Sequence, residues 1–251
     1  MQQKHFLTYG DGIFSYQRKR IQYEAVASAL FHWIYPLCKD DISDLYHQHK
    51  NLMDNCYGGR WIWKPHIILK ILDQISDNDI LIYCDAGCTI INHGYYKPFR
   101  EERFEYYMTL INNLIVPVTA FSPWTEAYWH EKKRPDYTQS SDPIYDSYVR
   151  YRFNLNTDHF RNYPGIEAGF ILIRKTPAAV AIIQEWFDLL VEDNYKLILQ
   201  HKLSDQALLN ILFYKHYLTV INGADFYGEG PFFATRFTDN GQKPGYNLPC
   251  L

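Results

Sequence analysis

The sequence predicts an α/β fold, a single domain with a mostly parallel central sheet flanked by helices. Three stretches carry this prediction: residues 5–12, 58–87 and 166–191. In each, a β-like apolar run lies next to a glycine turn or an amphipathic helical pattern. Strands that alternate with helical patterns are typical of βαβ units, whose helices cover both faces of a sheet.

The composition indicates a folded chain and argues against some partners. Apolar residues make up 47% of the 251 residues, and a chain of this size buries about 70% of its unfolded surface. A net charge of −3 with scattered basic residues predicts no binding to nucleic acid. No apolar run approaches the roughly 18 residues that span a bilayer, and we expect no signal peptide.

Cysteine and aromatic content add two expectations. The five cysteines have neither disulfide-framework nor zinc-site spacing, which fits a reducing compartment, the cytoplasm. The aromatic share is 17%, with 22 tyrosines, and indicates stacking surfaces as well as a core.

The first predicted unit is a strand over residues 5–9 that ends in a glycine turn. Such a turn lets backbone N–H groups approach a nucleotide, so Tyr9 and Gly10 are candidate nucleotide-binding residues. The turn lacks the spacing of a dinucleotide fingerprint, and an ordinary β-turn is the alternative. Arg20 lies in a basic run at the start of the next helix and is a candidate phosphate contact, or part of a solvated helix face. A strand over 32–37 and a short polar helix over 42–51 follow.

The central unit is a helix, a tight turn, a strand and an acid. The helix begins near Pro65, and its apolar face holds Ile67, Ile68, Ile71, Leu72 and Ile75. Residues 80–84 form a continuous apolar run, as expected of a strand buried on both faces. Asp85 follows at once, and Ala86 and Gly87 are small enough for a ligand to approach the backbone. Because ligands bind outside the carboxyl ends of strands in open α/β sheets, these three residues are candidate ligand contacts.

The second half of the chain continues the pattern around an irregular segment. Residues 124–163 are rich in Tyr, Trp, Arg and Asp with weak periodicity, and we expect loops and short helices that act as lids or binding loops. The remaining predicted elements are a loop over 88–97, a helix over 98–112, strands over 115–121, 166–173 and 217–221, helices beginning at Thr176 and Ser204, and a wrapping tail over 223–251.

The block GGRWIWKPHIILKIL…NDILIYCDAG, over residues 58–87, resembles a block of nucleotide-sugar glycosyltransferases with the GT-A fold, a group with bacterial and large-DNA-virus members. The segments GIEAGFILIRKT and SDQALLNIL resemble the second half of such enzymes. The resemblance implies one GT-A (Rossmann-like) domain, with residues 1–123 as the nucleotide-sugar-binding half and 124–251 as the acceptor side and tail. It implies transfer of a sugar from a UDP- or GDP-sugar to a hydroxyl of a carbohydrate or glycoprotein acceptor, in the host cytoplasm if the chain is viral.

In that family, a DXD-type acidic motif holds a divalent metal and the donor diphosphate. Here Gly87 stands where the motif would have its second acid. The resemblance implies Mn²⁺ or Mg²⁺ held by Asp85 together with diphosphate oxygens, and leaves metal-independent transfer open. Asp225, Glu229 and Asp239 are candidates for a further C-terminal ligand.

Glycosyl transfer requires a stabilised leaving diphosphate, and a deprotonated acceptor hydroxyl if the anomeric centre inverts. Arg60 and Lys64 are candidate phosphate contacts, with solvated loop cations as the alternative. Glu167 and Asp205 are the candidate catalytic acids on the acceptor side. For Asp205, the alternative is an acid that favours the helix dipole just after a Ser204 cap.

The sequence leaves two further questions open. Trp61 and Trp63 could stack on a base or sugar, or belong to the core. A sugar nucleotidyltransferase and a non-catalytic carbohydrate-binding protein are the competing function classes.

Overall fold

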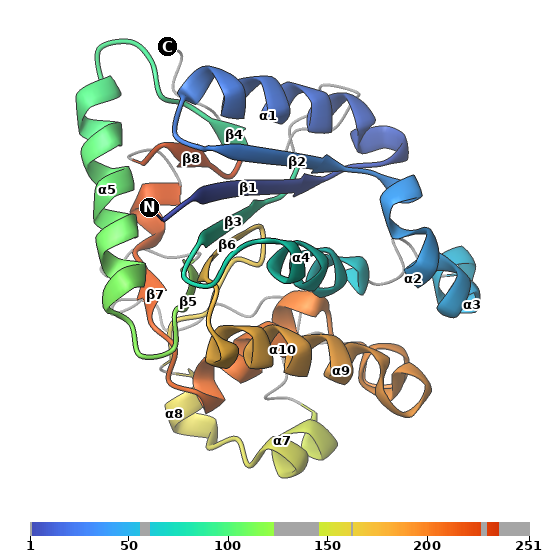
Figure 1. Cartoon of the computed structure of the whole chain (residues 1–251). Helices are drawn as coiled ribbons and strands as arrows, with labels where there is room; N and C mark the ends of the chain where they lie inside the picture. Colours follow the sequence, from blue (N-terminus) through green and yellow to red (C-terminus); the bar gives the residue numbers. More distant parts are fainter. Residues whose placement is uncertain (1, 56–60, 123–145, 162, 227–229, 236–251) are drawn as a thin grey trace.

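The computed structural model describes residues 2–55, 61–122, 146–161, 163–226 and 230–235. Helices flank a six-stranded sheet with the order β2-β1-β3-β6-β5-β7 (Figure 1). β6 is antiparallel to both of its neighbours, and the other neighbouring pairs are parallel. The predicted α/β class with a mostly parallel sheet is confirmed. The strands are β1 (Lys4–Tyr9), β2 (Trp33–Leu37), β3 (Ile80–Cys84), β5 (Val118–Phe121), β6 (Phe170–Arg174) and β7 (Val220–Ile221).

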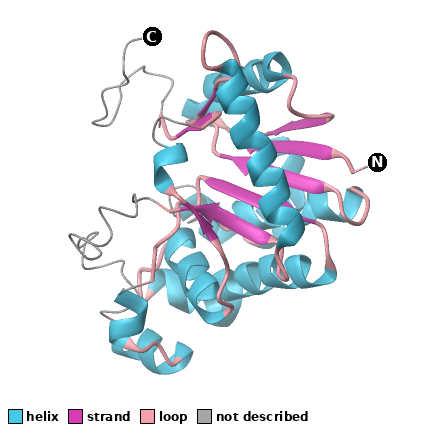
Figure 2. Cartoon of the chain, turned by 90° about the vertical axis from the view of Figure 1, so that its left-hand side faces the viewer, coloured by secondary structure: helices cyan, strands magenta, loops and turns pink. Residues whose placement is uncertain are grey.

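The central strand β3 is buried at every position, as its unbroken apolar run predicts. Successive side chains of a strand point to opposite faces. Leu81 and Tyr83 therefore enter one core, covered by one layer of helices, while Ile82 and Cys84 enter a second core, covered by another layer. Figure 2 shows the strands between these two helical layers.

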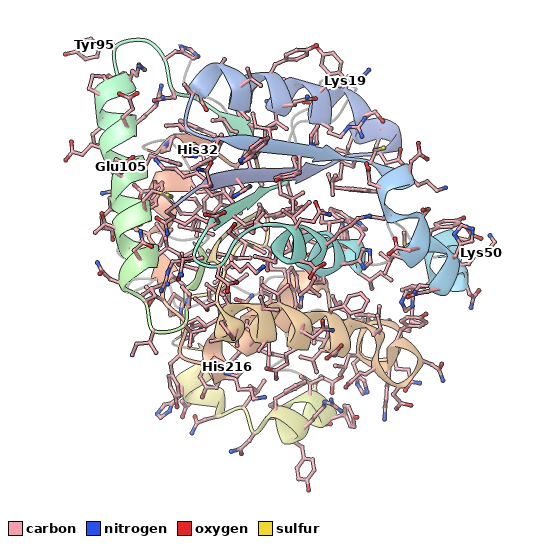
Figure 3. All side chains as sticks on the ribbon, in the orientation of Figure 1. Lys19, His32, Lys50, Tyr95, Glu105 and His216 are labelled. Atoms are coloured by element: carbon pink, nitrogen blue, oxygen red, sulfur yellow. The ribbon has the colours of Figure 1, made fainter. Side chains whose placement is uncertain are left out.

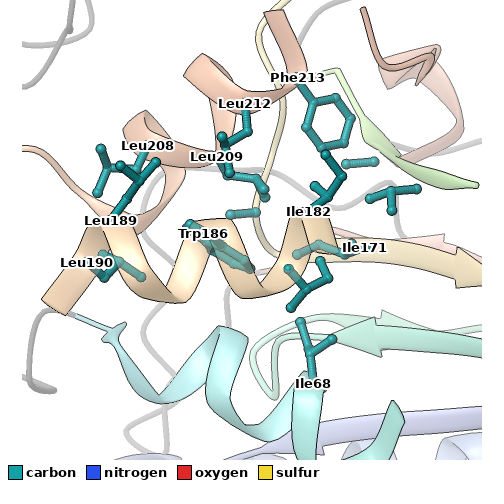
Figure 4. Close-up of a cluster of buried hydrophobic side chains, with 14 of the residues drawn as sticks. Ile68, Ile171, Ile182, Trp186, Leu189, Leu190, Leu208, Leu209, Leu212 and Phe213 are labelled. Atoms are coloured by element: carbon teal, nitrogen blue, oxygen red, sulfur yellow. The ribbon is translucent and has the colours of Figure 1, made fainter. Parts of the chain in front are cut away.

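The first layer consists of α4 (Trp63–Gln74), α9 (Pro177–Leu199) and α10 (Asp205–Lys215). Its centre is Trp186, fully buried among aliphatic side chains of α9, α10 and β6 (Figure 4). The predicted starts of the last two helices are confirmed, because Thr176 accepts a hydrogen bond from Ala179 N and Ser204 from Ala207 N. Non-helical backbone from Glu192 to Tyr195 interrupts α9.

The second layer consists of α1 (Ser15–Ser28) and α5 (Lys97–Asn113). A two-stranded ribbon of β4 (Thr89–Ile90) and β8 (Phe232–Phe233) lies with them in the same core. The sequence prediction placed loop and tail at these positions and was wrong there, since two residues are too short to show a strand period.

Several boundaries differ from the prediction. One expected helix over 42–51 is two, α2 (Ser43–Gln48) and α3 (Lys50–Asn55), after a 3₁₀ turn over Lys39–Ile42. Strand β6 begins at Phe170, so Glu167 lies in a preceding loop. Most of the segment 124–163 falls outside the described residues, and its described end forms α7 (Ser147–Phe153) and α8 (Thr157–Arg161). Further 3₁₀ turns cover Gly12–Phe14 and Gly223–Phe226. In the described part of the chain, no helix is both long and apolar enough to cross a membrane.

Burial of Ile82 predicts a large stability cost on truncation. Ile82 is 0% exposed in the core with α1 and α5, so Ile82→Ala should lower the free energy of unfolding by about 2–5 kcal/mol in urea titration. Ile115→Ala is the matched control, because Ile115 is 97% exposed and the same change there should stay within about 0.5 kcal/mol. Equal effects of the two substitutions would contradict the register of β3.

Candidate functional site

The site lies at the edge of the sheet where β1 and β3 end. These strands are parallel neighbours, so Tyr9 and Asp85 close the same edge. Because β6 runs antiparallel to β3, its first residue Phe170 pairs with Cys84. Asp85 N donates a hydrogen bond to Gly169 O at 2.9 Å. The loop before β6 is thereby brought beside the acid.

One buried ammonium joins the segments at this edge. Lys64 Nζ, from the first turn of α4, lies 3.4 Å from Asp85 Oδ1 and 2.9 Å from Asp205 Oδ2. It also donates to Ala168 O at 3.1 Å. The side chains of Lys64 and Asp205 are 5% and 7% exposed, whereas that of Asp85 is 39% exposed. Asp85 is the member of this trio that solvent or a ligand can reach.

The electrostatics of the trio follow from burial and charge. Burial alone would lower the pKa of Lys64, but Asp205 and Asp85 raise it above its usual value, so Lys64 is a cation. Burial is the largest influence on the pKa of Asp205 and, together with the charge of Asp85, raises it above the ordinary value, although Lys64 lowers it. Burial and the charge of Asp85 raise the pKa of Tyr83, whose hydroxyl stays protonated and donates to Asp85 Oδ1.

Two glycines allow close packing around Asp85. A Cβ on Gly169 would lie 3.1 Å from Asp85 Oδ2. A Cβ on Gly10 would lie 2.6 Å from Phe14 O and 3.2 Å from the Cβ of Ala86. The end of β1 therefore packs closely against the turn after β3, and a side chain at Gly10 would push these two segments apart.

Arg20 contacts the same turn from α1. Its Nη2 donates to Ala86 O at 3.1 Å and to Cys88 O at 2.6 Å. The guanidinium also pairs with Glu24 one helical turn further on. Its neighbour Lys19 points outward from α1 (Figure 3). The described contacts of Arg20 are thus to backbone and side chains of this chain, and its role toward a phosphate stays a prediction.

Three other candidate residues contact groups of the fold itself. Glu167 is 3% exposed, and its N–H donates to Phe121 O at 2.7 Å. Tyr9 stacks on Trp63, with ring centroids 4.3 Å apart. Asp225 is paired with Arg103. Arg60, Glu229 and Asp239 lie outside the described residues.

Sequence reasoning missed some residues that hold the site. Gln206 and Asn210 of α10 accept from Ala168 N and Ile166 N, at 3.3 and 2.7 Å, and so fix the loop before β6. The contact of Tyr83 with Asp85 could have been predicted from the sequence, because residues i and i+2 of an extended segment point to the same side.

Of the two carboxylates paired with Lys64, that of Asp85 is the one that a divalent cation could reach. No group of three His, Cys, Asp or Glu side chains that could hold a metal occurs within the described ranges. Asp85 Oδ1 is engaged by Tyr83 and Lys64, while Oδ2 faces Gly169. A Mg²⁺ or Mn²⁺ ion bound to this one carboxylate would have to complete its shell with phosphate oxygens and water.

Comparisons with known proteins find similar solved structures at low sequence identity. No protein-family model and no curated protein matches the chain. One similar structure is a glycosyltransferase involved in the glycosylation of the major capsid of PBCV-1, with 10% identity and a TM-score of 0.38, over 78% of this chain and 73% of that one. Another is apo mouse xyloside xylosyltransferase 1, with 11% identity and a TM-score of 0.42, over 88% and 84%.

The raised pKa of Asp205 predicts a pH-dependent effect of Asp205→Asn. A carboxyl with a raised pKa in the folded state stabilises the fold below its ordinary value of 3.8, and this contribution is lost as pH rises through the folded value. The asparagine variant should therefore gain stability relative to the parent between pH 4 and pH 7, measured by urea unfolding.

Asp77→Asn, at an 82% exposed side chain, is the control for removing one carboxylate. If Asp205→Asn loses stability relative to the parent over the same interval, burial does not dominate the pKa of Asp205.

Proposed function

We propose that this chain is a glycosyltransferase that moves a sugar from a UDP- or GDP-sugar to a hydroxyl of a carbohydrate or glycoprotein acceptor. The observation that carries the proposal is the position of Asp85, a solvent-accessible carboxylate at the carboxyl edge of the sheet beside the end of β1. Ligands bind at this edge in open α/β sheets. The resemblance to nucleotide-sugar glycosyltransferases, over residues 5–12, 58–90 and 165–213, supports the same function.

The donor would lie across the ends of β1 and β3. Tyr9 ends β1 and Gly10 follows it, while Asp85, Ala86 and Gly87 follow β3. Asp85 would hold Mn²⁺ or Mg²⁺ through its exposed carboxylate. The cation, when bound, would neutralise charge on the leaving diphosphate.

The acids Glu167 and Asp205 would serve the acceptor side. The raised pKa of Asp205 makes its carboxylate a stronger base than that of an ordinary aspartate, which suits a group that takes a proton from a hydroxyl. Lys64 and Gln206 would keep Asp205 next to the loop before β6, which contains Glu167. Lys64 contacts both Asp205 and Ala168 O, and Gln206 accepts from Ala168 N.

The test is turnover of a panel of UDP- and GDP-sugars, with manganese, by the wild-type chain and by Asp85→Asn. Removing this charge should cut transfer and donor hydrolysis about 100-fold or more. The melting temperature should change little, because Lys64 keeps its contact with Asp205.

Asp73→Asn, on the exposed side of α4, is the matched control and should retain full turnover. Retained turnover with lowered stability in Asp85→Asn would make Asp85 a turn residue. Binding of sugars without turnover of any donor would favour a carbohydrate-binding protein, and formation of a nucleotide sugar from a sugar phosphate would favour a nucleotidyltransferase.

A further inference from the structure

The turn that follows Asp85 is held by a continuous chain of hydrogen bonds. Arg20 Nη1 donates to Thr89 Oγ1 at 3.1 Å, and the hydroxyls of Thr89 and Thr235 lie 2.8 Å apart. Thr235 Oγ1 donates to Gly87 O at 2.7 Å. Because each hydroxyl has one hydrogen, Thr235 accepts from Thr89, and Thr89 accepts from Arg20. The chain therefore runs in one direction, from the guanidinium to the turn.

The same guanidinium binds the carbonyl groups on either side of Gly87. Arg20 Nη2 donates to Ala86 O and Cys88 O, so three consecutive carbonyl groups of the turn are bound. Thr235 and Ala86 are 5% and 3% exposed. Hydrogen bonds in such a shielded network strengthen one another.

Arg20 is itself fixed before it reaches the turn. Gln17 Oε1 accepts from Arg20 Nε at 2.7 Å, and Glu24 pairs with Nη1 from the next helical turn. Glu24 Oε2 also accepts from Ile90 N at 2.9 Å, which ties α1 to β4 just beyond the turn. Helix α1 thus holds the guanidinium of Arg20 in a fixed orientation toward the turn.

We propose that Arg20, Thr89 and Thr235 are positioning residues that orient the turn so that the carboxylate of Asp85 faces the donor. The proposal rests on the donor-binding role proposed above for Asp85. Arg20 then acts through the backbone of the turn. Thr235 follows β8, which pairs with β4 just after the turn. Residues 230–235 thus complete the site around Asp85, although they lie far from it in the sequence.

The test is Thr235→Val in the full chain, which keeps the shape and removes the hydroxyl. Removing a group that orients a metal-ligating side chain typically costs about 10–100-fold in activity. We therefore expect kcat of Thr235→Val to fall by about that factor. Thr235→Ser restores the hydroxyl and should restore kcat. If Thr235→Val does not fold, Thr89→Val interrupts the same chain one bond earlier.

Thr119→Val is the matched control. Thr119 is fully buried on β5, and its Oγ1 donates to Thr219 O at 2.8 Å, so the substitution removes the same kind of bond away from the turn. It should leave kcat within about twofold of the wild type. An equal fall of kcat in both variants would show general destabilisation and overturn the proposal.

A second measurement needs no substrate. Amide hydrogen exchange at Cys88, whose N–H donates to Asp85 O at 2.9 Å, should be faster in Thr235→Val than in Thr119→Val. Unchanged exchange in Thr235→Val would overturn the positioning role. If the wild type uses no donor, the proposed function fails, while this exchange result still decides whether the chain of bonds sets the turn.

Discussion

The structure depends on one buried ammonium that compensates two carboxylates. Lys64 lies within ion-pair distance of Asp85 and Asp205, and both Lys64 and Asp205 are almost fully buried. Charges removed from water are costly unless they are paired and hydrogen-bonded. The side chain of Lys64 therefore ties the end of β3 to the first turn of α10, and through Ala168 O to the loop before β6.

This constraint explains why the acids differ in exposure. Asp205 is closed off by Lys64 and by the packing of Trp186, whose indole donates to Asp205 O at 3.0 Å. Asp85 has Tyr83 and Lys64 on one oxygen, and its side chain remains 39% exposed. The buried network thus leaves the carboxylate of Asp85 accessible at the edge where the donor is proposed to bind.

The sequence predicted those features of the fold that depend only on residues close to one another in the chain. The apolar run of β3, the acid that follows it, and the caps at Thr176 and Ser204 are such features. The antiparallel course of β6 and the β4–β8 ribbon depend on pairing between distant segments, which periodicity does not report. For the same reason the sequence offered Lys64 and Arg20 as phosphate contacts and gave no sign of their partners within the fold.

The most direct test of the central claim is urea unfolding of Lys64→Met. Loss of the cation leaves two carboxylates uncompensated, and the free energy of unfolding should fall by about 3–5 kcal/mol, with much of it recovered in Lys64→Met/Asp205→Asn. Lys215→Met, which breaks an exposed pair with Glu185, should cost at most about 1 kcal/mol. A loss of less than about 0.5 kcal/mol for Lys64→Met, or no recovery in the double variant, would contradict the claim that this ammonium holds the site together.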